Sequence, residues 1–289
     1  MATTTAKAFD EFLGILAPTS TEKSRFDGRV SSVSTYLGNA FGSSSDMPLD
    51  RTRLIGSGAK GTAIHPVEDA DALAVFGNAQ AVYDKYRWDS KQFLYRVKDA
   101  LDGYRVSVVG ARGQAVRLYY ADPPWADIAP VLPVSGGGFF LPAGDGTWVR
   151  TYPEDDLDWF ARRNAELNYH LKPMVRLAKA WNRTHSKHFR SFHLEVMVAA
   201  AFTSLGADYR HALQLWFENP HINVSAPSSG DALDAYMPYM SAKRREANSV
   251  LQSSAERAGN ARAAEARGDH RESIRLWRII LGGEFPAFG

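Results

Sequence analysis

The sequence has no cysteine, no long apolar run and almost no net charge. Without cysteine it cannot form disulfide bonds, thiolate zinc sites or a cysteine nucleophile. No apolar run approaches the roughly 20 residues that span a bilayer, and residues 1–10 carry no apolar signal core. We therefore expect a cytoplasmic protein without membrane contact. A net charge of +2 over 289 residues does not indicate an obligatory nucleic-acid partner.

The composition is that of an ordinary globular protein, with 45% hydrophobic and 23% charged residues. The chain is long enough for one large core or for two closely packed lobes. No internal repeat or low-complexity segment interrupts it. Function must therefore be sought in local motifs.

The most informative stretch runs from residue 54 to residue 76. An apolar run ends at Gly56 and Ser57, a small-residue loop containing Lys60 follows, and a second apolar run opens with Asp69 and Asp71. Side chains two apart in a strand point the same way, so this spacing places two carboxylates on one face. Mg²⁺ favours carboxylates together with substrate phosphates, which backbone N–H groups and a hydroxyl at residues 56–57 can bind. The alternative is a plain turn between two strands, with acidic residues and a solvated lysine at its rim.

This stretch resembles the catalytic core of the nucleotidyltransferases of the DNA polymerase beta superfamily. Within that superfamily it is most similar to the CD-NTases, the bacterial relatives of cyclic GMP-AMP synthase. The matching string is Gly56-Ser57-x-Ala59-Lys60-Gly61-Thr62-Ala63-Ile64, followed by Asp69-x-Asp71. The resemblance implies that Asp69 and Asp71 are catalytic metal ligands and that Gly56, Ser57 and Lys60 bind phosphate.

A third carboxylate is expected from a later strand. Asp127 lies near the start of an apolar segment that ends in proline, and it resembles the third catalytic aspartate of the family. Asp122 competes for this role, but it precedes two prolines and is typical of a turn. The family chemistry uses two Mg²⁺ ions, with Mn²⁺ as an alternative, and a third carboxylate that can also accept the proton of the attacking hydroxyl.

Two segments in the second half of the chain resemble the nucleotide-binding helices of the family. Residues 175–182 match the helix whose lysine, here Lys179, reaches the triphosphate. Residues 191–195 match its partner helix, in which Ser191 binds phosphate and Phe192 stacks on a base. A solvated Lys179 and a core position for Phe192 are the alternatives.

Hydrophobic periodicity predicts strands mainly before residue 150 and helices mainly after it. Hairpins are expected for residues 105–109 with 115–119 and for 136–142 with 143–150. Two helices are expected over residues 5–41. A single helix is expected over each of 84–102, 195–205, 209–217, 238–267 and 270–281, and 156–181 is expected to be helical with a kink or join at Pro173.

The expected fold class is therefore α+β. The resemblance implies a polymerase beta-like catalytic lobe over residues 1–150, whose N-terminal helices lie across both lobes. A helical nucleotide-binding lobe over 151–289 would pack against it, with the active site in the cleft.

The resemblance further implies a function in bacterial anti-phage (CBASS) signalling. The enzyme would join ribonucleoside triphosphates, ATP and GTP above all, into a cyclic di- or trinucleotide second messenger and release pyrophosphate. CBASS accessory proteins are implied as partners, including conjugation at Gly289, for which a frayed tail is the alternative. The carboxylates support nucleotidyl transfer, whereas cyclisation is implied by the resemblance alone.

Three other functions stay open. A linear oligonucleotide synthase or a tRNA nucleotidyltransferase would share all of these residues. A catalytically inactive module would bind nucleotide without releasing pyrophosphate. A nucleic-acid-binding regulator would need a basic stripe, for which residues 243–245 are the local candidate, although a solvated helix face explains them as well.

Overall fold

The computed structural model describes residues 2–104, 106 and 108–289. It divides into two compact units. The sheet unit consists of Thr19–Gly61 and Val67–Asp158, and the helical unit consists of Met1–Pro18, Thr62–Pro66 and Trp159–Gly289. This division differs from the expected boundary at residue 150, because the first helix and the short segment 62–66 belong to the helical unit.

Within the described residues, the sheet unit is built on a mixed sheet of seven strands. Its main strand order is β1-β2-β5-β4-β3, and β6 pairs with β5 and β7 with β6. Its two central strands, β2 and β5, are parallel, and all other pairs are antiparallel. The strands are β1 (Leu49–Leu54), β2 (Asp69–Phe76), β3 (Val108–Arg112), β4 (Ala115–Tyr119), β5 (Trp125–Pro133), β6 (Phe139–Pro142) and β7 (Trp148–Thr151).

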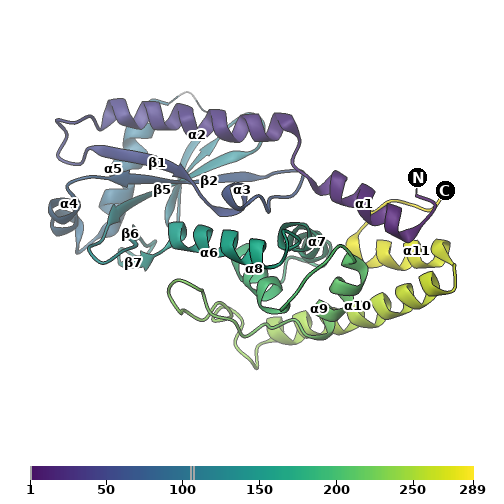
Figure 1. Ribbon diagram of the computed structural model, residues 1–289. Coiled ribbons are helices and arrows are strands. Elements are labelled where there is room, and N and C mark those ends of the chain that lie inside the picture. The colour runs from purple at the N-terminus through teal and green to yellow at the C-terminus, as the bar shows by residue number, and fades with distance from the viewer. Residues whose placement is uncertain (1, 105, 107) are drawn as a thin grey trace. The chain divides into compact units, whose positions relative to one another are not determined.

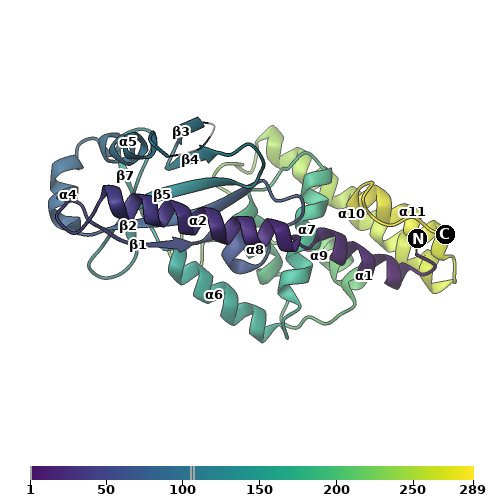
Figure 2. The same cartoon turned by 90° about the horizontal axis from the view of Figure 1, so that it is seen from above.

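Strict alternation along β2 and β5 gives the sheet two different faces. Even-numbered side chains such as Ala72, Ala74 and Ile128 enter a core with α2 (Ser20–Ala40), α4 (Ala79–Tyr86) and α5 (Ser90–Leu101). Figures 1 and 2 show α2 running across this face of the sheet. The odd-numbered residues therefore point to the opposite face. All three predicted catalytic aspartates are on this face, within the first three residues of their strands.

The helical unit is organised around α7 (Leu171–Thr184), which contacts α1, α8, α9 and α11. Its Trp181 is fully buried and meets the ring of Trp216 edge-on at 5.3 Å between centroids. Figure 1 shows the two ends of the chain close together, and Ala2 forms a bridge with Phe288. The other helices are α1 (Thr5–Leu16), α6 (Pro153–Glu166), of which the part from residue 159 belongs here, α8 (Ser191–Ala200), α9 (Tyr209–Glu218), α10 (Ala242–Ala266) and α11 (His270–Leu281).

Two of the expected helices are divided differently in the structure. The single helix expected over residues 84–102 is wrong, because α4 ends at Tyr86 and α5 begins after Asp89, whose side chain caps it. The break expected at Pro173 lies earlier, where Asn168 and Tyr169 adopt positive φ between α6 and α7. Pro173 sits in the first turn of α7, where its missing N–H costs no hydrogen bond.

Other boundaries shift by a few residues. The helix expected over 238–267 begins at Ala242, because the side chain of Ser241 accepts from the backbone N–H of Arg244 and caps it. The helix expected over 195–205 is α8, which ends at Ala200. The first hairpin is formed by β3 and β4, and residues 105 and 107 of its predicted strand lie outside the described residues. Over the described residues, no helix is both long and apolar enough to cross a bilayer.

Candidate active site

The three predicted catalytic aspartates lie on one face of two neighbouring strands. Asp71 on β2 is paired in register with Asp127 on β5, and Asp69 is two residues before Asp71 on the same face. The side chains of Asp69 and Asp127 are 41% and 16% exposed. Because β2 and β5 are parallel, two carboxylates that are far apart in sequence lie side by side where their strands begin.

Gly56 brings the backbone of the Gly-Ser motif directly against Asp71. Its φ is +64°, and a Cβ at this position would lie 2.3 Å from Asp71 Oδ2. The backbone N–H of Ile55 also donates to the carbonyl of Asp71 at 2.8 Å. Any side chain at residue 56 would be strained and would press on the carboxylate, so glycine is required here. The motif is thereby fixed beside the aspartates, with Ser57 half-buried next to it.

Lys60 is not placed as expected. It is the last residue of a short helix, α3 (Gly56–Lys60), rather than part of an open loop. Its side chain is buried and not solvated at a rim.

Arg117 is a site residue that the sequence analysis missed. It lies on β4 directly opposite Asp127. Its Nε donates to Asp127 Oδ1 at 2.6 Å, and its Nη2 donates to the second oxygen of Asp127 and, at 3.3 Å, to Asp69 Oδ2. The Arg117 side chain is only 7% exposed. Hydrogen bonding to Asp127 raises the pKa of Arg117 above its already high ordinary value.

A signal for Arg117 was present in the sequence. In the expected strand 115–119, Val116 and Leu118 alternate with it and enter the core under the helices. An arginine between them must face the other side of the sheet, which is the face of the aspartates. What the alternation could not supply was the pairing of β4 with β5, which puts the guanidinium opposite Asp127.

The donor set is suitable for a hard divalent cation, because it consists of three carboxylates on one face. Across the described residues, no three histidine, aspartate or glutamate side chains are already gathered around one common point. Asp69 and Asp127 instead share the guanidinium of Arg117. A cation at this face would therefore have to share Asp127 with Arg117.

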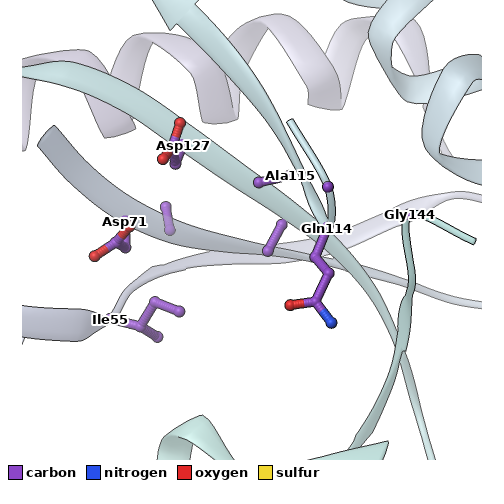
Figure 3. Close-up of a pocket in the computed structure, with 9 residues that line it drawn as sticks. Ile55, Asp71, Gln114, Ala115, Asp127 and Gly144 are labelled. Atoms are coloured by element: carbon purple, nitrogen blue, oxygen red, sulfur yellow. The ribbon is translucent and has the colours of Figure 1, made fainter. Parts of the chain in front are cut away.

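A cavity of about 490 Å³ adjoins the carboxylates. Figure 3 shows Asp71 and Asp127 on neighbouring strands at one side of it and Gln114 at the other. Two turns that lie close together border the cavity, since a Cβ on Gly144 would lie 3.4 Å from the Cα of Gly113. Its lining consists of Ile55, Asp71, Ala72, Gly113, Gln114, Ala115, Asp127, Ala129 and Gly144.

Lys179, one of the predicted nucleotide-binding residues of the helical unit, is part of a buried ion pair. Lys179 Nζ donates to Glu195 Oε1 at 2.7 Å and to Thr62 Oγ1 at 3.1 Å, and Thr62 Oγ1 donates to the same glutamate oxygen at 2.6 Å. The side chains of Lys179 and Glu195 are 8% and 3% exposed, so a solvated Lys179 is wrong. Ser191 begins α8 and is exposed, and Phe192 after it is half-buried.

Comparison with known proteins places these features in context. A family model described as "Second Messenger Oligonucleotide or Dinucleotide Synthetase domain" matches residues 3–164. A probable cyclic nucleotide synthase of Bacillus cereus (strain VD146) is 23% identical over 275 residues, covering 80% of this chain and 81% of that protein. A cyclic AMP-AMP-AMP synthase of Acinetobacter sp. is 25% identical over 263 residues, covering 81% and 72%.

Solved structures share the fold. CdnC of E. coli MS115-1, in its complex with HORMA-deltaN, has a TM-score of 0.77 at 18% identity and covers 98% of both chains. The di-nucleotide cyclase DncV of Vibrio cholerae, as a double mutant, has a TM-score of 0.75 at 14% identity and covers 95% of this chain and 94% of its own. These likenesses confirm the expected α+β, polymerase beta-like fold.

Proposed function

The chain belongs to the Second Messenger Oligonucleotide or Dinucleotide Synthetase family, and from this premise we propose that it joins ribonucleoside triphosphates into a cyclic di- or trinucleotide and releases pyrophosphate. The observation that carries the proposal is the row of charged side chains across three strands. Asp71, Asp127 and Arg117 lie opposite one another on β2, β5 and β4, with Asp69 beside them.

In the proposed reaction Asp127 is the base. Its carboxylate accepts the proton from the ribose hydroxyl that attacks the α-phosphate. Arg117 orients Asp127 by holding both of its oxygens, so the carboxylate presents its remaining lone pairs in a fixed direction. The backbone N–H groups at Gly56 and the hydroxyl of Ser57 bind the phosphates next to Asp71.

The family is one of metal-dependent nucleotidyltransferases. We propose Asp69, Asp71 and Asp127 as the ligands and two Mg²⁺ ions as the cofactor, with Mn²⁺ as a substitute. When bound, a divalent cation supplies positive charge that neutralises the phosphate oxygens. Arg117 contributes a permanent positive charge to two of these carboxylates, Asp69 and Asp127.

For the helical unit, the roles implied by the resemblance are retained as proposals. Ser191, exposed at the start of α8, would donate to a phosphate, and Phe192 would stack on a base. Lys179 would have to share its ammonium group between Glu195 and a phosphate oxygen. Lys60, being buried, is proposed only to add positive charge near the Gly-Ser motif.

The partners are proposed from the relatives. Structures of relatives contain ATP in E. coli CdnC and GTP in Bradyrhizobium diazoefficiens CdnG, and CdnC is also found with a HORMA protein. We propose ATP, GTP or both as substrates here, a cytoplasmic location, and accessory proteins of bacterial anti-phage signalling as partners. Conjugation at Gly289 would require release of this residue, whose N–H donates to Ala2 O at 3.3 Å.

Incubation with labelled ribonucleoside triphosphates and Mg²⁺, followed by phosphatase, tests the function. With the label on the α-phosphate, a cyclic product keeps all of its label because it has no terminal phosphate, whereas a linear product loses the label of its 5′-terminal phosphate and keeps only that of its internal linkages. Asp69→Asn should abolish pyrophosphate release while the protein stays folded. Asp99→Asn, at a position whose side chain is 70% exposed on α5, is the matched control. Near-normal pyrophosphate release by Asp69→Asn would refute the assignment, and none from the native protein would indicate an inactive binding module.

A further inference from the structure

We propose that Gln114 recognises the adenine base of a substrate nucleotide in the cavity beside Asp71 and Asp127. The inference rests on the proposed function and adds a base preference to the same site. Gln114 lies in the turn between β3 and β4, which otherwise contributes only Gly113 and Ala115 to the lining.

The lining of the cavity suits a neutral, flat group. Its volume of about 490 Å³ lies in the range of small-molecule sites. The walls are formed mainly by glycine, alanine and isoleucine, and no lysine or arginine is among the nine lining residues. Apart from Asp71 and Asp127, which the proposed function assigns to the metal ions, the lining carries no charged side chain, so it suits the uncharged purine ring of a nucleotide.

Gln114 is the polar group that can select among bases. Among the nine lining residues, it is the one besides the aspartates whose side chain is able to form hydrogen bonds. Its exposed amide is bonded to none of the side chains that the structure describes, so it is available to a ligand. An amide offers a donor next to an acceptor, which matches the amino group and adjacent ring nitrogen of adenine in a bidentate pair.

Two turns and a strand end define the position of Gln114 beside the cavity. Gly113 and Gly144 bring two turns into contact, and the Ala115 end of β4 is fixed by its pairing with β3. The register of β4 with β5 places Arg117 opposite Asp127, three residues after Gln114. β4 therefore carries Arg117, which orients Asp127, and the turn immediately before β4 carries Gln114, the residue proposed to recognise the nucleobase.

The test is the composition of the product made from equal concentrations of all four ribonucleoside triphosphates, measured by mass spectrometry. Gln114→Glu replaces the donor with a second acceptor, which mismatches adenine but suits the two adjacent N–H donors of guanine. We expect the adenine-to-guanine ratio to fall about tenfold or more. Gln114→Ala should lower the ratio less, because it removes the selection without reversing it.

The matched control is Gln92→Glu, which adds the same charge on an exposed position of α5 and should leave the ratio unchanged. For any variant with too little turnover to analyse, competition between ATP and GTP for binding measures the base preference as a ratio of affinities. An unchanged ratio in Gln114→Glu would overturn the role of Gln114 while native pyrophosphate release still supports the proposed function. Absence of release from the native protein would instead overturn that function.

Discussion

Replacing Arg117 by methionine should destabilise the sheet unit and slow catalysis together. The substitution keeps the aliphatic volume but removes a guanidinium that is 7% exposed and contacts two carboxylates. Removing one partner of a buried ion pair typically costs about 3–5 kcal/mol. Because Asp127 is 16% and Asp69 41% exposed, water will solvate part of the uncompensated charge, and we expect a loss of about 2–3 kcal/mol in the free energy of unfolding. This corresponds to a melting temperature lower by roughly 5–10 °C.

Thermal unfolding with and without Mg²⁺, together with pyrophosphate release, measures both effects. Arg117→Lys keeps the charge but loses the two-pronged hydrogen bonding, so its loss should be intermediate. Mg²⁺ should stabilise Arg117→Met more than the native protein, since it supplies the missing positive charge. Arg53→Met is the matched control, because this strand arginine is 46% exposed and its pair with Glu154 should contribute at most about 1 kcal/mol. Native stability and native turnover in Arg117→Met would refute the positioning role.

Three further results are expected. Gly56→Ala should abolish most pyrophosphate release, because its Cβ would lie 2.3 Å from a carboxylate oxygen of Asp71. Gly58→Ala is the control and should keep the native rate, because no neighbouring atom lies nearer than 3.5 Å to its Cβ. Similar rates for both variants would contradict the close approach at Gly56. Lys179→Met and Glu195→Gln should each lower the free energy of unfolding by about 3 kcal/mol, but only Lys179→Met should weaken ATP binding, and equal ATP affinities would remove Lys179 from the phosphate site. Burial lowers the pKa of His193, so the stability given by its neutral ring is present above the unfolded value near 6.5 and is lost as the pH falls below it. Urea unfolding between pH 5 and 7.5 should show a shallower pH dependence for His193→Gln, and an identical slope would rule this contribution out.

Much of the fold could be predicted because it depends on local periodicity. The alternation along β2 and β5 and the helical spacing in α1, α2, α9 and α11 reflect chain geometry that neighbouring residues determine. Helix breaks were less predictable. The break between α4 and α5 and the positive φ of Asn168 and Tyr169 before α7 depend on packing that competes with a continuous apolar pattern.

The candidate site shows the same division. The spacing of Asp69 and Asp71 in a strand was enough to place both carboxylates on one face, because successive side chains alternate by stereochemistry. Asp127 lies beside Asp71 only because β2 and β5 pair in parallel. The spacing of residues does not predict this pairing, and Asp127 was identified through the family resemblance.

The sequence by itself determined which side chains of a strand share a face and where most of the helices and strands lie, since these depend mainly on contacts within a few residues. The tertiary structure alone decided which charges meet: Arg117 with Asp127, and Lys179 with Glu195 and Thr62. Such pairs join residues whose separation in sequence carries no information about their distance in space. A buried charge must find a partner, but only the folded chain determines which partner is within reach.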